Sequence, residues 1–595
     1  MANYKFKEIE PEILEFWKEK QIYKKAKEKN QGNQTFTFLE GPPYTSGKIH
    51  LGTAWNKSFK DSVMRFKRMK GLDVWDRAGF DMHGLPTENK VAEKFNFTRK
   101  DEIEEYGVEK FQKECEKFCT ENMDIMIKDF KRIGVWMDFD DPYMPIKPEF
   151  MEGEWFLAKK AYQNGRLYEG AKVMTWCAKC ATSLSKHELE YKNVEDNSVF
   201  VKLKVKDSAD DYLIIWTTTP WTLPFNLAVM VNPTLDYVKI STESDGKKEN
   251  WIIAKGLVGV LMGLLGKDYE VLEEFRGDKL EGMRYEPIFR KHSPIYDELA
   301  SKHEHAFTVV LSEEFVDLSA GSGLVHCAPG CGPEDQVIGI RYGLPAFNET
   351  DEYGTFMDTM KDLAGLRAKL DDAIFIEHLQ NQGSLLISTQ VEHDYAHCWR
   401  CKSPVVFRAT KQWFFKVEDL KDRMLELNSE VKWAPESALN AFESWLKNIK
   451  DNGITRQRYW GTPVPIWKCD TCKNINVVGS IDELKEKAGK LPENFHKPWI
   501  DELTWKCDCG GTMTRIPDIF DVWIDAGCAG WICYDYPQRT DLFDKWFPAD
   551  FITEGKDQIR GWFNLLVVAS TLAFDKIPFK SVYMHGFIND YRGIK

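Results

Sequence analysis

The same local pattern occurs near both ends of the chain, and it limits the fold more than any other feature. Residues 35–39, TFTFL, predict a strand, which a Gly/Pro turn joins to a segment with apolar residues at helical spacing, and LDVW at 72–75 predicts the next strand. Near the other end, DFIT at 550–553, a helix from about residue 557 to 574 and the strand KSVYMHGF repeat the pattern. We therefore predict an α/β fold with a doubly wound, Rossmann-like parallel sheet that binds ligands at the carboxyl ends of its strands.

The segment between these two units predicts a different architecture. It is rich in short strands, Gly and Pro, as in DDYLIIWTTTPWTLPFNLAVMV. A chain of 595 residues is too long for one hydrophobic core. We expect a mostly β domain inserted into the parallel-sheet domain, and an amphipathic helix in the first thirty residues, with Pro11 near its start, packed on the sheet.

Charge and hydropathy exclude several classes of protein. The net charge of −13 argues against a protein coated in positive charge for nucleic acid, although a local basic face is compatible with it. The longest apolar stretch, residues 251–266, is interrupted by Lys255 and too short to span a bilayer. The N-terminus lacks the apolar core of a secretory signal, so we expect a cytoplasmic location.

The loop after the first strand, GPPYTSGKIHLGT, is similar to a phosphate loop but lacks its spacing. Gly41 and Gly47 are separated by five residues instead of four, and Ile49 stands where the nucleotide-binding loop has a hydroxyl residue. Pro42 and Pro43 have no backbone N–H to offer to a phosphate. A P-loop is therefore excluded.

The remaining feature of this loop is a rigid turn followed by a helix start. His50, Gly52 and Thr53 lie at that start, where free N–H groups and the helix dipole favour an anion. The alternative is a surface loop with an incidental histidine.

Paired cysteines have the spacing of metal ligands. One set brackets the β-rich segment and forms a four-thiolate site if that segment leaves and returns at one place, while the other set is local and shaped like a zinc ribbon. The alternative is reduced thiols without metal. We predict about two structural zinc ions, held by Cys177, Cys180, Cys398 and Cys401 and by Cys469, Cys472, Cys507 and Cys509, and expect the remaining cysteines to be free.

Several motifs together resemble one enzyme family. HLGT at 50–53, RAGFDMHGLPTE, WTTTPWTLPFN, GLVHCAPGCGPED, RQRYWGTPVPIW, DVWIDAG and EGKDQIRGWF are similar to class I aminoacyl-tRNA synthetases, and among them to isoleucyl-tRNA synthetases of archaeal type. Leucyl and valyl enzymes usually carry an arginine in the stretch matching TTTP at 217–220, which is unbroken here and followed by Trp221. Thr53 departs from the family signature, which often has a second histidine, so a hydroxyl would contact phosphate there.

The resemblance implies an isoleucine–tRNA ligase. ATP, accompanied by Mg²⁺, would activate isoleucine to isoleucyl-adenylate, and the aminoacyl group would then move to tRNA(Ile). Positioning and charge stabilisation by His50, Gly52 and Thr53 would carry catalysis. The resemblance places ATP and adenylate on Gly41, Pro42, Glu554, Gly555, Asp557 and His585. It places the amino acid on Pro42, Asp81, Trp523, Gln558 and Trp562. Asp81 would bind the ammonium, and the tryptophans would surround the side chain. Taken alone, each tryptophan is more often a core residue.

The resemblance also implies a second, hydrolytic site for Val-tRNA(Ile). One methylene changes the binding free energy in an alkyl pocket by only about 1–3 kcal/mol, so such a pocket discriminates poorly between isoleucine and valine. Isoleucine-specific synthetases are themselves the standard example of this value. The implied editing pocket lies in the β domain, with Asp335 on the ammonium and His326 limiting its size. Without the neighbouring matches, the threonine run would be ordinary strand composition. The pocket comprises Thr217, Thr218, Thr219, Thr222, Asn226, His326 and Asp335.

The resemblance suggests domain boundaries and a continuation. We expect the chain to stop just before the family's KMSKS loop, of which Lys595 would be the first lysine, as a fragment or as one of two polypeptides that form a monomer once completed. The expected domains are 1–34 (N-terminal helix), 35–185 (first half of the catalytic domain), 186–395 (editing domain), 396–515 (connective region with zinc ribbon) and 516–595 (second half).

Two other functions remain open at this point. A stand-alone editing hydrolase would need only the threonine cluster and Asp335, and it would deacylate mischarged tRNA without ATP. A non-catalytic tRNA-binding subunit is disfavoured, because both predicted pockets keep their polar residues.

Overall fold

The chain forms two compact units. The computed structural model describes residues 5–184, 188–244, 246–589 and 591–593, so Lys595 lies outside the described residues. Unit 2 is Gly170–Lys411, and unit 1 consists of Met1–Glu169 with Gln412–Lys595. Within the described ranges, no helix is both long and apolar enough to cross a lipid bilayer. The finer domain boundaries expected from the sequence stay predictions.

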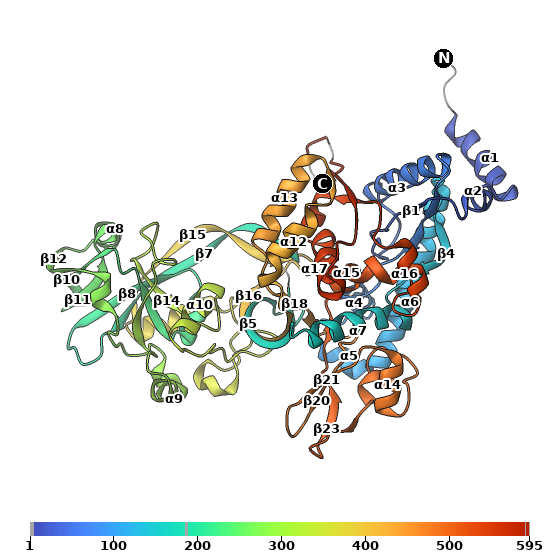
Figure 1. Ribbon diagram of the computed structural model, residues 1–595. Coiled ribbons are helices and arrows are strands. Elements are labelled where there is room, and N and C mark those ends of the chain that lie inside the picture. The colour runs from blue at the N-terminus through green and yellow to red at the C-terminus, as the bar shows by residue number, and fades with distance from the viewer. Residues whose placement is uncertain (1–4, 185–187, 245, 590, 594–595) are drawn as a thin grey trace. The chain divides into compact units, whose positions relative to one another are not determined.

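A parallel sheet joins the two distant halves of unit 1. Its strands are β1 (Thr35–Thr37), β2 (Asp73–Trp75), β17 (Lys432–Ala434), β25 (Ile552–Gly555) and β26 (Ser581–His585). Strand β1 pairs with β2, β25 pairs with β26, and β26 pairs with β17, all in parallel. A parallel bridge between Phe38 and Phe551 links the two groups. The doubly wound sheet predicted from the repeated pattern is therefore confirmed (Figure 1).

The connections of β1 and β25 make a topological switch point in this sheet, which we call the crevice. Helix α3 (Leu51–Met69) leads from β1 to β2, while α17 (Trp562–Phe574) leads from β25 to β26. Because β1 and β25 are neighbours, their connections diverge to opposite sides at this point, which is where open α/β sheets bind ligands. The predicted helix start at residue 557 is wrong, because a 3₁₀ turn (η8, Lys556–Ile559) and the non-helical Gly561 precede α17.

Other helices and short strands cover unit 1. The helices are α4 (Leu85–Lys94), α5 (Asp101–Tyr106), α6 (Val108–Arg132), α7 (Pro148–Gln163), α12 (Lys421–Asn428), α13 (Glu436–Lys447), α14 (Ile481–Ala488), α15 (Val522–Ile532) and α16 (Thr540–Trp546). Strand β3 (Arg77–Gly79) pairs with β4 (Asp138–Tyr143), and β19 (Thr455–Arg456) with β24 (Ile519–Phe520). A ribbon of β21 (Ile475–Val477), β20 (Ile466–Cys469), β23 (Thr512–Arg515) and β22 (Trp505–Lys506) carries the second cysteine set.

The N-terminal segment differs from its prediction. It forms two helices, α1 (Phe6–Glu19) and α2 (Ile22–Asn30), because Gln21 adopts a left-handed conformation with φ 50°. No residue of α1 is buried, and Pro11 lies inside this helix. The expected single helix is therefore wrong, whereas packing on the sheet is confirmed for α2, which contacts β2 and whose Tyr23 donates to Asp76 at 2.8 Å.

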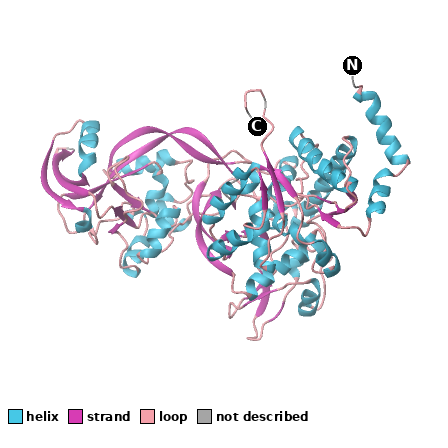
Figure 2. Cartoon of the chain, turned by 45° about the horizontal axis from the view of Figure 1, so that its top comes forward, coloured by secondary structure: helices cyan, strands magenta, loops and turns pink. Residues whose placement is uncertain are grey.

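Unit 2 is built on a long antiparallel pair and a mixed sheet. Strands β7 (Leu189–Lys204) and β15 (Leu385–Cys398) run antiparallel from Leu189 opposite Cys398 to Val201 opposite Leu385 (Figure 2). The rest of the sheet has the order β12-β10-β11-β8-β14-β9-β13, with β7 on β8. These strands are β8 (Asp211–Thr217), β9 (Ala228–Val231), β10 (Asp236–Ser244), β11 (Lys247–Ala254), β12 (Tyr269–Arg276), β13 (Thr308–Leu311) and β14 (Leu324–Cys327).

Helices complete unit 2, and two strands carry the chain into and out of it. The helices are α8 (Lys255–Leu265), α9 (Ile295–Lys302), α10 (Pro333–Arg341) and α11 (Asp372–Asn381). Strand β5 (Leu167–Cys177) enters, and β16 (Val406–Phe415) returns. The expected β-rich insertion is confirmed by this sheet.

Candidate functional site

The start of α3 organises the predicted catalytic residues. His50 is the N-cap of the helix, and its Nδ1 accepts a hydrogen bond from the backbone N–H of Thr53 at 3.2 Å. The Thr53 Oγ1 lies 3.1 Å from His50 Nε2. A Cβ on residue 52 would come within 3.1 Å of the His50 ring, so Gly52 gives the imidazole room. An imidazole and a hydroxyl therefore meet at a helix N-terminus, where an anion is favoured.

Glycines bring the ends of β1 and β25 into close approach. A Cβ on Gly41 would lie 2.4 Å from the Oε1 of Glu554, so only glycine admits that carboxylate. Gly555 pairs in register with His585 and would clash with Asp557 Oδ1, at 2.7 Å, if it had a Cβ. The predicted adenylate residues from both halves of the chain thus gather at the crevice of the sheet.

Buried ion pairs, which sequence reasoning missed, support this crevice. Glu40 accepts from the Nζ of Lys57 and of Lys60, each at 2.6 Å, and Lys60 reaches Glu554 at 2.5 Å. Burial alone would raise the pKa of Glu40, but the two ammonium groups outweigh it and hold that pKa below its usual range. Asn56 donates to the second oxygen of Glu554 at 2.6 Å. The available signal was an acid directly after a strand and two lysines three residues apart on the next helix.

These lysines also define the buried face of α3. The apolar residues that indicated the helix are not its buried stripe, and Phe66 is 54% exposed. The buried residues of the helix are Lys57, Lys60, Met64 and Arg68. Paired charges, not apolar side chains, therefore seat most of this helix against the sheet.

Asp81 is fixed by the loop that follows β1. Its backbone N–H donates to the carbonyl of Pro43 at 3.0 Å, and its carbonyl accepts from the N–H of Thr45 at 2.9 Å. Within the described part of the chain, its Oδ1 is buried and has no hydrogen-bond partner. Burial raises the pKa of this carboxyl well above its ordinary value. An incoming ammonium group would satisfy both the orphaned oxygen and the charge.

The other predicted amino-acid residues lie on α15 and around the start of α17. Gln558 accepts from the backbone N–H of Trp562 at 3.1 Å and donates to Asp557 at 2.9 Å. The indole N–H of Trp562 donates to the carbonyl of Ala526, so this side chain ties α17 to α15. A Cβ on Gly561 would lie 2.6 Å from the Trp523 ring, so that glycine makes room for the indole.

In unit 2, threonine hydroxyls converge on a buried histidine. The Oγ1 of Thr217 lies 3.2 Å from that of Thr219, which lies 3.3 Å from that of Thr222. Thr222 Oγ1 is 3.0 Å from His326 Nε2 on β14. Burial lowers the pKa of His326 to about 4, so the ring is neutral near pH 7. Thr218 lies half-buried between these residues in the sequence.

Asp335 and Asn226 are buried as well but have separate anchors. Asp335 accepts from the backbone N–H of Ala328 at 3.1 Å, and burial raises its pKa to about 6. Asn226 donates to the carbonyl of Ala228 and accepts from the hydroxyl of Tyr285 at 2.5 Å. The amide of Asn226 is therefore engaged in structure rather than joined to the hydroxyl chain.

Both cysteine sets are assembled by the fold. Their sulfur atoms lie within 4.8 Å of one another in each set. In unit 2, pairing of Leu189 with Cys398 brings the two ends of the insertion together, and the N–H of Cys180 donates to the sulfur of Cys177. Four converging thiols with N–H donors suit tetrahedral zinc. The unit 2 set is largely buried, whereas Cys472 and Cys509 of the ribbon are exposed.

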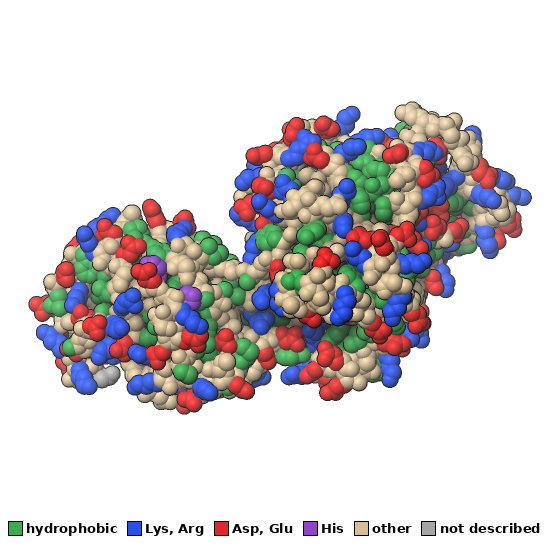
Figure 3. All heavy atoms as spheres, turned by 60° about the horizontal axis from the view of Figure 1, so that its bottom comes forward, with side chains coloured by type: hydrophobic (Ala, Val, Ile, Leu, Met, Phe, Trp, Pro, Cys, Tyr) green, Lys and Arg blue, Asp and Glu red, His purple; other side chains and the backbone are tan. Residues whose placement is uncertain are grey.

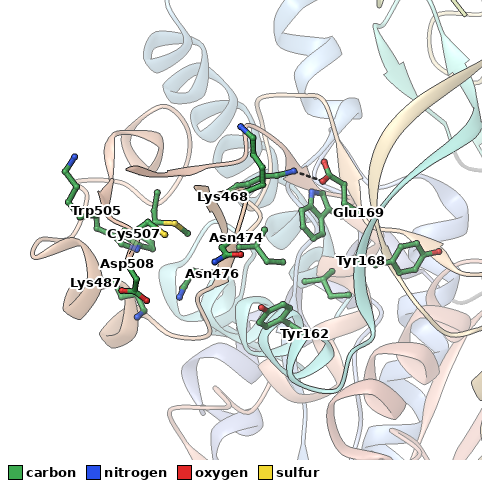
Figure 4. A pocket seen from close by; sticks show the side chains of 16 residues that line it. Tyr162, Tyr168, Glu169, Lys468, Asn474, Asn476, Lys487, Trp505, Cys507 and Asp508 are labelled. Atoms are coloured by element: carbon green, nitrogen blue, oxygen red, sulfur yellow. Dashed lines mark hydrogen bonds and ion pairs between the residues drawn. The ribbon is translucent and has the colours of Figure 1, made fainter. Parts of the chain in front are cut away.

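A cavity of about 770 Å³ lies beside the ribbon of unit 1 (Figure 4). Its lining includes Asn474, Asn476, Trp505 and Cys507, and Lys468 at its edge is paired with Glu169 at 2.6 Å. The predicted substrate residues are not part of this lining.

On the face shown in Figure 3, side chains of both charges are interspersed, so that face carries no broad basic surface for nucleic acid.

The sequence matches one family model over nearly its whole length. That model is described as tRNA synthetases class I (I, L, M and V), and it matches residues 12–595. The chain belongs to this family.

The names of individual relatives are more specific than the description of the family model. Isoleucine--tRNA ligase of Archaeoglobus fulgidus is 45% identical over 596 residues, covering 100% of this chain and 57% of the relative. The enzyme of the same name from Pyrococcus horikoshii is 45% identical over 616 residues, covering 99% and 57%. A solved ternary complex of a leucyl-tRNA synthetase from Agrobacterium radiobacter K84 aligns with 17% identity and a TM-score of 0.45, covering 100% of this chain and 69% of that chain. The chain spans little more than half the length of the curated relatives.

Proposed function

We propose that this class I synthetase activates isoleucine and edits valine as part of an isoleucine–tRNA ligase. The observation that carries the proposal is the crevice between β1 and β25, where Gly41 lies against Glu554 from the opposite end of the chain and Asn56 of α3, the helix that His50 caps, donates to the same carboxylate. The identity to ligases named for isoleucine and the arginine-free threonine run support isoleucine as the amino acid.

In the proposed activation step, the isoleucine carboxylate attacks the α-phosphate of ATP and displaces pyrophosphate. Asp81 would hold the ammonium, with its free Oδ1 accepting a hydrogen bond. His50, Thr53 and the N–H groups at the start of α3 would stabilise the negative charge that develops on the phosphate oxygens. Mg²⁺ bound with ATP would neutralise part of the same charge. The protein needs no nucleophile of its own, because positioning and electrostatics supply the catalysis.

In the proposed editing step, water hydrolyses the ester of valine misattached to tRNA(Ile). Asp335 would bind the valine ammonium, and its burial leaves it ready for a counter-charge. The hydroxyls of Thr219 and Thr222, with neutral His326, would orient the ester and the water. The longer side chain of isoleucine would be excluded by His326, which limits the size of the pocket.

The proposal includes zinc and a cytoplasmic setting. Each cysteine set would hold one structural zinc ion, which supplies a fixed cross-link and takes no part in the reaction. A reducing compartment keeps such thiols available for metal. The partners of the complete enzyme would be isoleucine, ATP and tRNA(Ile).

Pyrophosphate exchange tests the activation site. We expect isoleucine-dependent exchange between ATP and labelled pyrophosphate, stronger than with leucine, and its loss in His50→Ala. Lys48→Ala serves as the matched control, because Lys48 is exposed in the same loop and has no proposed role. Exchange that does not depend on isoleucine would contradict the assignment.

Deacylation separates this function from its rival. A stand-alone editing hydrolase would hydrolyse Val-tRNA(Ile). In that case neither wild type nor Asp81→Ala would catalyse pyrophosphate exchange, and neither would bind isoleucine. Calorimetric binding of isoleucine to wild type, absent in Asp81→Ala, supports the ligase.

A further inference from the structure

Four buried titratable groups lie beneath the amino-acid site, and the proposed chemistry uses none of them. His83 follows Asp81 by two residues, and Asp525 lies on α15, two residues after Trp523. Glu154 on α7 and His496 before the 3₁₀ turn η7 (Trp499–Glu502) complete the set. All four are at most 2% exposed.

The hydrogen-bond directions in this cluster follow from one obligatory donor. The backbone N–H of His496 donates to the side-chain amide of Asn494 at 2.9 Å. The atom of that amide that faces His496 is therefore the oxygen Oδ1, an acceptor, and not the NH₂ group. The same oxygen lies 2.7 Å from His496 Nδ1. An acceptor faces that nitrogen, so Nδ1 of His496 carries the proton.

The next contact fixes the tautomer of His83. Burial lowers the pKa of His496 well below its ordinary value, so the ring is neutral and its Nε2 is an acceptor. His83 Nε2 lies 2.9 Å from it and therefore donates. Burial also lowers the pKa of His83, to about 3, which leaves its Nδ1 without a proton. Trp460 stacks on His496 at 4.7 Å and keeps these rings in place.

The chain of donors begins at the carboxyl of Asp525. Asp525 Oδ2 lies 2.8 Å from the bare Nδ1 of His83, so the carboxyl must donate, and the Thr462 hydroxyl is more distant at 3.4 Å. The buried carboxyl of Glu154 lies close enough to interact electrostatically with that of Asp525, but neither of its oxygens has a hydrogen-bond partner among the described residues. Burial raises the pKa of both acids well above their ordinary values. All four groups are thus neutral, as burial without a counter-ion requires.

We propose that Asp525, His83 and His496 form a one-directional chain of neutral donors and acceptors that positions the amino-acid site. The chain runs from Asp525 through His83 and His496 to the side-chain amide oxygen of Asn494. It ties the loop of Asp81 to the first turn of α15, which carries Trp523. These are positioning residues, because none of them faces the substrate.

Neutrality of this chain has an electrostatic consequence at Asp81. A charge on Asp525 would raise the pKa of Asp81 further and weaken the carboxylate that the ammonium needs. With Asp525 protonated, the negative charge that attracts the amino group is concentrated on Asp81. This consequence rests on the proposed function, whereas the direction of the hydrogen bonds does not.

Histidine NMR tests the chain without any ligand. In protein labelled with ¹⁵N-histidine, we expect neutral signals from pH 5 to 8, with the Nε2–H tautomer for His83 and the Nδ1–H tautomer for His496. His83→Gln and His496→Gln identify the two signals by their disappearance. A doubly protonated His83 at pH 7 would overturn the proposal, because Asp525 would then be ionised.

Substitution of Asp525 tests the positioning role. Asparagine has the same shape and can donate to His83, so D525N should bind isoleucine within about threefold of wild type. D525A leaves buried partners unsatisfied and should bind at least about tenfold more weakly, without a change in ATP binding. Equal loss in D525N and D525A would show that Asp525 acts as a charge and overturn the proposal.

Three controls distinguish a misfolded variant, an incorrect proposed function and an incorrect hydrogen-bond chain from one another. Asp544→Ala, an exposed position on α16, should match wild type in calorimetry. If D525A does not fold, H83Q and H83A make the same comparison one step along the chain, with binding retained only in H83Q, whose amide can accept from Asp525 and donate to His496. If wild type binds no isoleucine, the proposed function fails, and the His83 tautomer alone decides on the chain.

Discussion

The two candidate sites are both buried but differ in how they handle charge. In unit 1, buried Glu40, Lys57, Lys60 and Glu554 form ion pairs at 2.5–2.6 Å. In unit 2, the groups around His326 are hydroxyls, and the imidazole itself is neutral near pH 7. One site is held by paired charges and the other by neutral hydrogen bonds.

This difference follows the chemistry proposed for each unit. Phosphoryl transfer develops charge on several oxygens, and a frame of fixed charges can stabilise it without reorganising. Ester hydrolysis needs an oriented water and a single ammonium contact, which neutral donors and one carboxylate provide. We infer that each pocket is most sensitive to a different kind of substitution.

Metal removal gives the largest expected effect and compares the two cysteine sets. A chelator should strip the exposed ribbon set first and the buried unit 2 set later. Structural zinc stabilises small domains by about 10–16 kcal/mol in apparent binding energy, so loss of the second ion should unfold its surroundings. Metal analysis should find about two zinc ions, and release can be followed with a zinc indicator together with thermal unfolding. Simultaneous release from both sets would contradict the difference in burial.

Breaking the buried ion network of unit 1 should come next in size. Lys60→Met leaves Glu40 and Glu554 with less compensation and should lower the free energy of unfolding by about 3–5 kcal/mol. Lys70→Met, at the exposed end of the same helix, is the matched control and should change it by less than about 0.5 kcal/mol. Urea unfolding measures both. Equal stability of the two variants would mean that the network contributes nothing.

The two carboxylates that face the proposed ammonium groups should be functionally independent. Asp81→Ala should reduce isoleucine-dependent exchange by about 100-fold, since it removes a buried counter-charge, and should spare Val-tRNA(Ile) hydrolysis. Asp335→Ala should do the reverse. Damage to the same activity by both substitutions would refute the assignment of two sites.

The smallest effect concerns stability and its dependence on pH. The pKa of Asp335 is raised to about 6 in the folded state, so the folded protein holds this proton more tightly than the unfolded chain, and stability falls as pH rises from 3.8 to 6. Asp335→Asn removes this penalty. It should stabilise the protein by up to about 3 kcal/mol at pH 7 and by less than about 1 kcal/mol at pH 4, while abolishing editing. Thermal unfolding at both pH values checks the sign, and a variant that is less stable at pH 7 would contradict it.

Short-range features of this protein could be determined from its sequence. The cysteine spacing, the strand–loop–helix pattern at both ends and the helix start at Leu51 are local, because the physics that produces them acts over a few residues. Family motifs added candidate residues such as Asp81 and Glu554. The division of the N-terminal segment at Gln21 was not predicted, because the sequence has no glycine there to signal a left-handed residue.

Only the tertiary structure decided which charges are buried and with whom. Lys57 and Lys60 belong to a helix whose apolar residues suggested another face, and their burial depends on Glu40 and on Glu554 at the far end of the chain. Asn56 meets Glu554 across 498 residues, and His83 meets Asp525 across 442. A charged side chain is stable inside a protein only with a partner, and a neutral acid only with an acceptor. Those partners come from pairings such as Phe38 with Phe551, which no local pattern in the sequence encodes.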